Sequence, residues 1–379
     1  MLEKLKENKN NLFYISIIFI ISRIFILTIA LVSPNTLGNI VNIFDSEHYQ
    51  SIAYNGYTKE LLTAFFPIVP LIIKYFGIYG MILVSQLSSF GTLLIIDKLL
   101  ENIKTKTKLF ALAIFAFCPL TTFSIIPYTE NLFFFLTILA FYLFVKRKIG
   151  FLLGIVIGLC VATRNSGSML FFAIFIAMLY LWFKKEIKFI NIVKTYIPAT
   201  IISCLYPLYL QLNYGNWKIF MDCQNPYWGK VDSNILFLLK NQISIIFNPH
   251  HYDGANRTEI VILFYRINEI LTIILGLCIL ALGIIIIRKY FKNKQNMDIA
   301  NLIVCYMYVI LSMFCFTLSI RNPMVDSPST SFYRYFLALF PIYLAIGNLK
   351  EKYIKIIFLL TLGLTFFTAL YFYTNVFFY

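Results

Sequence analysis

Charge is scarce in this sequence. Only 13% of the 379 residues are Asp, Glu, Lys or Arg, about half the usual share in soluble domains. Hydrophobic residues make up 60%, and the mean hydropathy is +0.79. This composition excludes a soluble globular protein and predicts an all-α protein that crosses the membrane many times.

The sequence patterns of several common functional sites are also missing. The seven cysteines show no metal-ligand or disulfide spacing, so we expect packing thiols and no metal centre. No glycine-rich phosphate loop is present, which argues against an ATP-driven pump. A net charge of +15 would suggest nucleic-acid binding in a soluble protein. Here the basic residues lie in short clusters between apolar runs, so we interpret them as topology signals and expect no nucleic-acid partner.

Eleven hydrophobic runs suit membrane-spanning helices of about 20 residues. The predicted spans are 11–32, 78–97, 109–126, 130–145, 149–163, 168–183, 193–213, 260–287, 299–318, 335–349 and 355–374. No charged run or Pro/Ser-rich linker divides them, so residues 1–379 are predicted to form one integral-membrane domain. Three long connections remain, at 33–77, 214–259 and 319–334.

Basic residues mark every second connection. Besides the N-terminal segment, Lys and Arg gather in 98–108, 146–148, 184–188, 288–294 and 350–355. Because short cytoplasmic loops carry an excess of Lys and Arg, this alternation predicts a cytoplasmic N-terminus. The three long connections are then predicted to lie on the far side of the membrane.

The first long connection holds Asp45, Glu47 and His48 within four positions, shortly before the apolar segment 64–72. Acidic side chains near lipid are found mainly where they handle ions, protons or substrates. A partly desolvated carboxylate suits a general base that takes a proton from an attacking hydroxyl group, so we predict a catalytic cluster here. Two alternatives stay open. Asp45 caps a helix that starts at Ser46, or Asp45 and Glu47 bind a divalent cation, for which two carboxylates are a weak indication.

Lone arginines on the predicted far side are candidate phosphate ligands, because a guanidinium group matches phosphate geometry. Arg164 and Asn165 lie in the turn between the fifth and sixth spans. The third long connection contains a second group, made of Arg321, Asp326, Tyr333 and Arg334. Both arginines also have a structural interpretation. Arg164 would reach the membrane interface with its charged end, and Arg334 would anchor the start of the tenth span.

Two smaller features complete the candidates. Tyr128 and Glu130 precede the fourth span as possible substrate-binding residues, although Thr129 as a cap and Glu130 as a partner of the helix dipole would explain them structurally. Arg23 lies in the middle of the first span without a local acidic partner, and its role is open.

Five segments, taken in order, resemble the PIG-V-type mannosyltransferase family (GPI mannosyltransferase II-like). They are FDSEHYQSIAYNGY at 44–57, AFFPIVPL at 64–71, PYTENLF at 127–133, TRNSG at 163–167 and FYRYF at 332–336. In this resemblance Asp45 matches the acid of the family's first loop. Glu47 and His48 match the D-x-E-H form of its eukaryotic members, whereas Phe44 replaces the usual Trp.

The resemblance implies a GT-C-type glycosyltransferase with a far-side active site. It implies a polyprenyl (dolichyl) phosphate mannose donor, a glycolipid acceptor and inversion at the anomeric carbon. In eukaryotic members the acceptor is a glycosylphosphatidylinositol precursor that receives its second mannose. The membrane would be the endoplasmic reticulum in a eukaryote and the plasma membrane in a prokaryote, with an accessory membrane subunit as a further possible partner. A transporter or flippase of lipid-linked sugars is the alternative.

Overall fold

The computed structural model is all-α throughout the part of the chain that it describes. It describes residues 2–231, 234–248, parts of 262–281, 298–317, 320–321 and 332–374, without the side chains of residues 2–10, 317, 332 and 333. Within these ranges the only extended pairing is an isolated bridge between Lys230 and Arg321. Much of the predicted eighth span (260–287) and most of the third long connection lie outside the described residues.

The chain divides into two compact units. Unit 1 comprises residues 1–53, 69–142 and 340–376, and unit 2 comprises 54–68, 143–339 and 377–379. The single domain predicted from the sequence stays a prediction. Unit 1 contains α1 (Leu2–Val32), α2 (Leu37–Ile40), most of α3 (Asp45–Asn55), α4 (Ile68–Leu99), α5 (Thr105–Ala116), the 3₁₀ helix η2 (Pro119–Ile125), most of α6 (Glu130–Val145), α16 (Pro341–Ile346) and α17 (Glu351–Tyr373).

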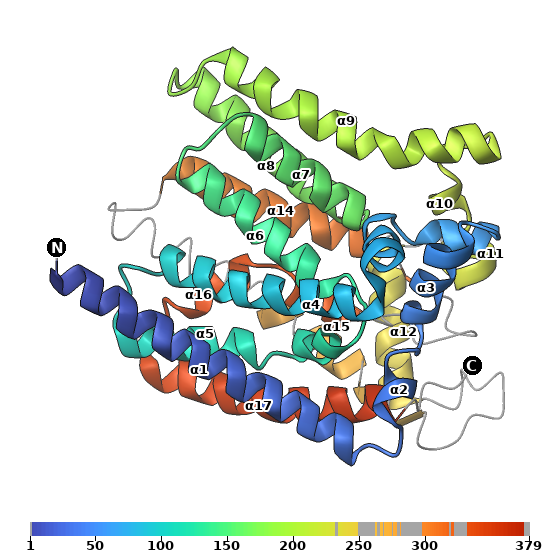
Figure 1. Ribbon diagram of the computed structural model, residues 1–379, viewed down its shortest axis with the longest axis horizontal. Coiled ribbons are helices and arrows are strands. Elements are labelled where there is room, and N and C mark those ends of the chain that lie inside the picture. Colours follow the sequence, from blue (N-terminus) through green and yellow to red (C-terminus); the bar gives the residue numbers. More distant parts are fainter. Residues whose placement is uncertain are drawn as a thin grey trace. The chain divides into compact units, whose positions relative to one another are not determined.

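In unit 1, α1, α5 and α17 lie side by side, and η2 packs against α17 (Figure 1). Two basic connections meet at one end of these helices. Glu351 at the start of α17 forms ion pairs with Lys106 (2.9 Å) and Lys355 (2.8 Å). Close by in sequence, buried Lys108 pairs with buried Asp97 of α4 at 2.6 Å. The predicted placement of connections 98–108 and 350–355 on one side agrees with these contacts.

The other end of α17 lies near the predicted catalytic segment. Phe372 packs on Phe44 with ring centroids 5.1 Å apart, and the Tyr373 carbonyl accepts a hydrogen bond from Asn35 (2.7 Å). A helix of 23 residues is about 34 Å long, close to the thickness of a bilayer's hydrocarbon core. The Asp45 end and the basic end of unit 1 are therefore separated by about one membrane thickness.

Unit 2 contains η1 (Glu60–Ala64), α7 (Phe151–Thr163), α8 (Gly167–Phe183), α9 (Phe189–Tyr214), α10 (Ile219–Asp222), α11 (Gln224–Trp228), α12 (Ile235–Phe247), α14 (Ile299–Thr317) and α15 (Phe332–Leu337). Helix α7 packs along α9, and α8 packs along α14 (Figure 1). Arg147, just before α7, forms ion pairs with Glu186 after α8 (3.9 Å) and with Asp298 before α14. These three connections therefore share one end of the unit, as the basic-residue pattern predicts for 146–148 and 184–188.

The contact between α7 and α9 depends on glycine. A Cβ atom added at Gly154 would lie 2.0 Å from the Thr195 carbonyl oxygen, and one at Gly158 would lie 2.7 Å from Ile202 Cβ. Small residues of this kind let membrane helices approach each other closely, and packing then replaces the hydrophobic effect as the main attraction.

Gly154→Ala is expected to lower the free energy of unfolding by about 1–3 kcal/mol, because the new methyl group overpacks the α7–α9 contact. Gly363→Ala in α17 is the matched control. Its Cβ meets nothing within 4 Å, so the better helix propensity of Ala should leave stability unchanged or raise it by up to about 1 kcal/mol. Thermal unfolding of both variants in detergent checks this. Equal effects of the two substitutions would contradict the packing argument.

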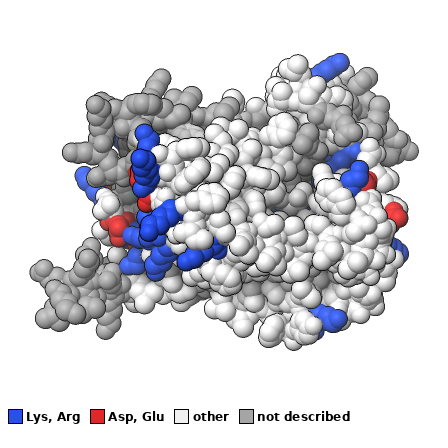
Figure 2. Space-filling view, turned by 90° about the horizontal axis from the view of Figure 1, so that it is seen from above, with Lys and Arg blue, Asp and Glu red and all other residues white. Residues whose placement is uncertain are grey.

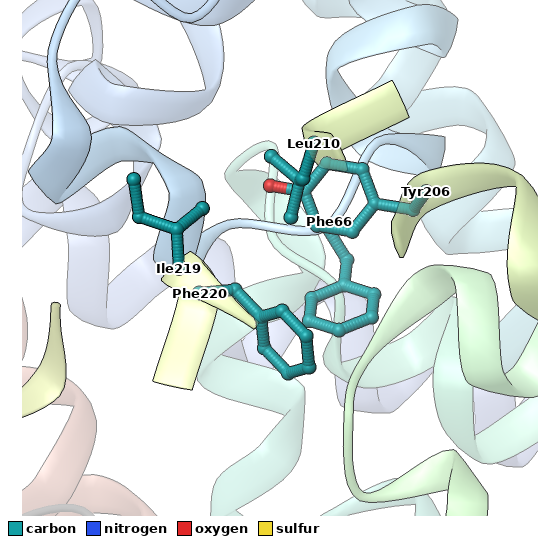
Figure 3. Packing of buried hydrophobic residues seen from close by; sticks show 5 residues of the cluster. All are labelled: Phe66, Tyr206, Leu210, Ile219 and Phe220. Atoms are coloured by element: carbon teal, nitrogen blue, oxygen red, sulfur yellow. The ribbon is translucent and has the colours of Figure 1, made fainter. Parts of the chain in front are cut away.

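An apolar cluster of unit 2 includes Phe66 from the segment 64–71 (Figure 3). Phe66 packs against Tyr206 (ring centroids 5.0 Å apart) and Phe220 (5.4 Å). Leu210 and Ile219 complete the cluster, with Tyr57 and Tyr214 packed beside it. The Tyr206 hydroxyl donates to the Thr63 carbonyl (2.8 Å), which satisfies the polar end of a buried ring. The apolar residues that follow the Asp45 motif thus build part of unit 2.

The predicted membrane character is confirmed, whereas the number of spans is not. In the described part, five helices are long and apolar enough to cross a membrane: Asn11–Val32 of α1, α4, α9, Ile299–Phe316 of α14 and α17. A sixth arises if α5 and η2, bent by 56°, count as one broken span. Helices α6, α7 and α8 are apolar but shorter. The protein is therefore a multi-pass membrane protein, and eleven spans stay a prediction.

Three predicted boundaries were wrong. The run 109–126 is not one helix, because Pro119 starts η2 after a break at residues 117–118. The run 335–349 is divided into α15 and α16, each six residues long. Residues 68–76, expected in a loop, are helical, and α4 breaks only at Gly77, where φ is 71°. The helix after Gly77 corresponds to the predicted span 78–97.

The surface agrees with a lipid environment. In Figure 2 most of the face shown carries neither acidic nor basic side chains, and the charged residues occur in small groups. Large apolar side chains are exposed along the candidate spans, for example Ile20 and Leu31 of α1 and Leu359 of α17. Such broad apolar exposure is expected where lipid rather than water surrounds the helices.

Candidate functional site

The predicted catalytic residues lie in the first turn of α3. Phe44 precedes them with φ of 51°, a left-handed conformation that is strained for a residue with a Cβ atom. Its ring is held against Phe372 of α17. Such strain persists only where the surroundings impose it, and it often occurs at functional sites. The helix begins at Asp45 itself, so the predicted cap with a helix starting at Ser46 is displaced by one residue.

Further contacts fix the N-terminus of α3. The Ser46 hydroxyl, fully buried, donates to the Val41 carbonyl. The Gln50 amide donates to the same carbonyl (3.1 Å) and to Asn42 Oδ1 (2.9 Å). The acidic first turn also suits the positive end of the helix dipole. The backbone that carries Asp45 is therefore held from both sides of the motif.

Tyr128 and Asp45, which the sequence suggested separately, are in contact. The backbone N–H of Asp45 donates to the Tyr128 hydroxyl at 3.1 Å. The Tyr128 ring is 1% exposed and stacks on Phe123 (centroids 5.0 Å apart), with Phe372 at its edge (5.8 Å). Tyr49 of α3 also meets the ring edge-on at 6.4 Å. Tyr128 thus holds the first turn of α3 against the buried core of unit 1.

The three ionisable residues of α3 differ in exposure. Asp45 and His48 are half-buried and, being three positions apart, share one face of the helix, whereas Glu47 is exposed. Burial lowers the pKa of His48 below its usual value, and the charges of Asp45 and Glu47 oppose that shift. The imidazole is therefore mainly neutral near pH 7. Asp45 and His48 form the pair best placed to take up a proton.

Glu130 lies deeper than the sequence suggested. It is the first residue of α6, is 1% exposed, and accepts a hydrogen bond from Thr129 Oγ1 at 3.4 Å. Next to it, the Asn131 amide donates to Ser85 Oγ of α4 at 2.9 Å. Its place in the first turn of α6 agrees with the dipole interpretation, and substrate binding by Glu130 stays a prediction.

Arg164 ends α7 in a sharp turn into α8. Its backbone is extended (φ −153°), and its carbonyl accepts a hydrogen bond from Gly167 N–H at 2.9 Å. A Cβ atom at Gly167 would lie 2.4 Å from the Cys160 carbonyl group, so only glycine fits there. The Asn165 side chain is exposed, and the Asn165 backbone carbonyl accepts a hydrogen bond from the Ser168 hydroxyl (2.6 Å). The Asn165 backbone therefore helps to close the turn, and substrate binding by its side chain stays a prediction.

Arg164 and Arg334 meet at one aromatic ring. The Tyr335 ring centroid is 5.0 Å from Cζ of Arg164 and 5.7 Å from Cζ of Arg334. Phe316 at the end of α14 stacks on the same ring at 5.3 Å. Cation–π contacts of this kind hold guanidinium groups in place, and guanidinium groups are common ligands of phosphate. Because Asp298 precedes α14 and Phe316 ends it, this ring lies at the opposite end of α14 from the Arg147 ion pairs.

Arg321, the third predicted phosphate ligand, lies opposite Lys230 in the isolated antiparallel bridge. Lys230 was not among the residues selected from the sequence. Its pairing with a residue far away in the chain leaves no local signal, although it directly follows the aromatic segment 225–229. We call Arg164, Lys230, Arg321 and Arg334 the basic cluster of unit 2. Asp326 lies outside the described residues, as does the Tyr333 side chain.

The described residues contain no group of three or more His, Cys, Asp or Glu side chains that could hold a metal ion. The two sets of candidate residues belong to different units. The half-buried Asp45 and His48 of unit 1 are able to accept a proton, and the cations around Tyr335 in unit 2 are able to bind an anion such as phosphate.

A scan against models of known protein families finds no match for this chain, and a search of curated proteins finds none either.

Proposed function

We propose that this protein is a membrane glycosyltransferase that moves mannose from a polyprenyl phosphate mannose donor to a glycolipid acceptor. The observation that carries the proposal is the position of Asp45. This residue is half-buried, its backbone N–H donates to Tyr128, and it lies about one membrane thickness from the basic end of unit 1. The ordered resemblance to PIG-V-type mannosyltransferases supports the sugar and the donor. In its more specific form, the proposal includes a GT-C architecture. In a eukaryote it also includes addition of the second mannose to a GPI precursor.

In the proposed reaction, Asp45 accepts one proton from the acceptor hydroxyl group. An acceptor hydroxyl oxygen attacks C1 of mannose, the bond between C1 and the phosphate oxygen breaks, and the electron pair leaves with the polyprenyl phosphate. The Asp45 carboxylate takes the hydroxyl proton, with His48 on the same helix face as the next acceptor. Because inversion needs attack from the side opposite the phosphate, no covalent sugar–enzyme intermediate is involved.

The basic cluster supplies the second role. Negative charge develops on the departing phosphate, and fixed cations stabilise it in the transition state. Arg164 and Arg334 are assigned to this role because Tyr335 orients both guanidinium groups. A phosphate leaving group of this kind needs neither a nucleotide nor a strong acid, and the assignment requires no divalent cation.

Arg164→Lys is expected to weaken donor use by about tenfold, seen mainly as a higher KM for the donor. Lysine keeps the charge but loses the planar fork that binds two phosphate oxygens and stacks on Tyr335. Arg147→Lys is the control, because it repeats the substitution in the ion pairs with Glu186 and Asp298. Steady-state rates at varied donor concentration check this, and an equal effect of the two substitutions would contradict the assignment.

The activity itself is tested with membranes that contain the protein. Labelled polyprenyl phosphate mannose and candidate glycolipid acceptors are supplied, with and without a chelator. Label is expected to appear in a glycolipid, at the same rate with the chelator present. Label that stays in the donor with every acceptor offered would count against the proposal.

Arg23 favours transport of lipid-linked sugars as a second candidate function. It is 8% exposed near the middle of the span Asn11–Val32, and its Nη2 donates to Ser89 Oγ at 3.2 Å. Within the described residues its buried Nη1 makes no hydrogen bond, and polar groups at mid-membrane depth are typical of transporters. In proteoliposomes, movement of chemically unchanged lipid-linked sugar between leaflets would support transport, and transfer of the sugar would support the enzyme.

A further inference from the structure

Lys230 is fixed opposite Arg321 by backbone contacts. Helix α11 ends at Trp228, the next residue Gly229 adopts a left-handed conformation (φ 61°), and the Lys230 N–H donates to the Gln224 carbonyl at 3.1 Å. The chain then pairs with the segment at Arg321, and Val231 N–H donates to the Ile320 carbonyl at 3.0 Å. The two cationic residues therefore face each other because of how unit 2 folds.

This arrangement places like charges together. Residues directly opposite in an antiparallel pair carry their side chains on one face, with Cβ atoms about 5 Å apart, and equal charges there are destabilising. Lys230 takes part in none of the ion pairs of the described residues. Burial and the charge of Arg321 lower the pKa of Lys230, while the Tyr335 hydroxyl opposes that shift. A half-buried lysine is thus kept beside a second cation at a cost in stability.

The same tyrosine links the pair to the other two arginines. Tyr335 acts electrostatically on Lys230, and its ring contacts the guanidinium groups of Arg164 and Arg334. Arg164 and Arg334 thus contact the Tyr335 ring, and Lys230, which lies opposite Arg321, is near enough to Tyr335 to interact with it electrostatically. An anion bound at this position would offset the repulsion between Lys230 and Arg321, because charge-assisted hydrogen bonds to phosphate are among the stronger polar contacts in proteins.

We propose that Lys230 and Arg321 form a binding position for the phosphate group of a polyprenyl phosphate, beside the arginines at Tyr335. The inference rests on the proposed function, since it names the group through which the donor is held. It adds Lys230 as a phosphate-binding residue, and it takes the ligand to be the lipid-linked phosphate of the proposed donor.

Binding to the purified full-length protein in nanodiscs tests this without any transfer reaction. The probe is polyprenyl phosphate without sugar, with uncharged polyprenol as reference and inorganic phosphate as competitor. Lys230→Gln is expected to weaken polyprenyl phosphate binding roughly tenfold and to leave polyprenol binding unchanged. Lys218→Gln is the matched control, because Lys218 is exposed, paired with Asp222 at 3.9 Å, and carries the same charge.

Thermal unfolding distinguishes binding from structural support. Because Lys230→Gln removes a like-charge contact, its unfolding temperature without ligand should equal or exceed that of the natural protein. Equal affinity of the Lys230→Gln and natural proteins for polyprenyl phosphate would overturn the proposal. A lower unfolding temperature of the variant, together with equal losses of affinity for polyprenyl phosphate and polyprenol, would also overturn it. Displacement by inorganic phosphate at concentrations comparable to the lipid would overturn the assignment to a lipid-linked ligand. The proposed transfer reaction would be contradicted by a different result, namely that the lipid phosphate binds as expected and no sugar is transferred.

Discussion

Asp45→Asn is expected to reduce mannosyl transfer by about 10²–10⁴-fold, the usual contribution of a general base. The amide keeps the size of the side chain but cannot take the proton from the acceptor hydroxyl. Folding should be little affected, because the contact between Asp45 and Tyr128 uses the backbone N–H. The lost charge at the start of α3 accounts for about 0.3–1 kcal/mol of helix-dipole stabilisation. Transfer rates at saturating donor and acceptor, with thermal unfolding in parallel, check both parts.

Asp222→Asn is the matched control for Asp45. Asp222 is exposed, ends the short helix α10 and accepts a hydrogen bond from Asn216 (2.8 Å). The same change there should leave transfer within twofold of the natural rate, on the order of 0.4 kcal/mol. Near-normal activity of Asp45→Asn would remove Asp45 from the mechanism. An equal loss in both variants would indicate a general effect of charge on the protein.

Asp97→Asn is expected to lower the free energy of unfolding by about 3–5 kcal/mol, the cost of breaking a buried ion pair by removing one partner. Asp97 and Lys108 are 6% and 5% exposed, and their charged atoms are 2.6 Å apart. The substitution leaves the Lys108 ammonium group buried without its counter-charge. Thermal unfolding in detergent measures the effect.

The double variant Asp97→Leu, Lys108→Met tests whether the loss of stability comes from the buried charge that is left without a partner. Replacing both partners by apolar residues leaves no uncompensated charge, so most of the lost stability should return. Glu351→Gln is the exposed comparison. Glu351 pairs with Lys106 and Lys355 at the same end of unit 1, and because this pair is exposed to solvent its loss should cost far less stability than Asp97→Asn. A stable Asp97→Asn variant would show that the buried pair does not hold α4 to α5.

Composition and charge pattern were enough to predict a helical membrane protein, and particular residues show why. The apolar runs at 193–213, 299–318 and 355–374 correspond closely to α9, α14 and α17. The basic connections that were predicted to share a side are in contact through Lys106 with Glu351 and Arg147 with Glu186. Because these features are local or repeated along the chain, they can be predicted from a single sequence.

Features that depend on breaks or on distant pairs were harder to predict. Pro119 and the polar residues that follow it were a visible signal for the break between α5 and η2, but the surrounding hydrophobicity outweighed it. The contact of Asp45 with Tyr128 joins segments 83 residues apart, and the bridge between Lys230 and Arg321 joins two loops. Neither leaves a periodic trace in the sequence. The role proposed for Asp45 follows from its residue type and its place in the sequence, whereas its neighbours could be identified only from the fold.

The central claim is transfer of a sugar from a lipid phosphate, and one measurement tests it most directly. Purified protein is incubated with doubly labelled polyprenyl phosphate mannose and a glycolipid acceptor, and both products are counted. The account predicts one mannosylated glycolipid for each free polyprenyl phosphate released, and neither product with Asp45→Asn. Release of polyprenyl phosphate without a mannosylated lipid, or equal amounts of both products with Asp45→Asn, would contradict it.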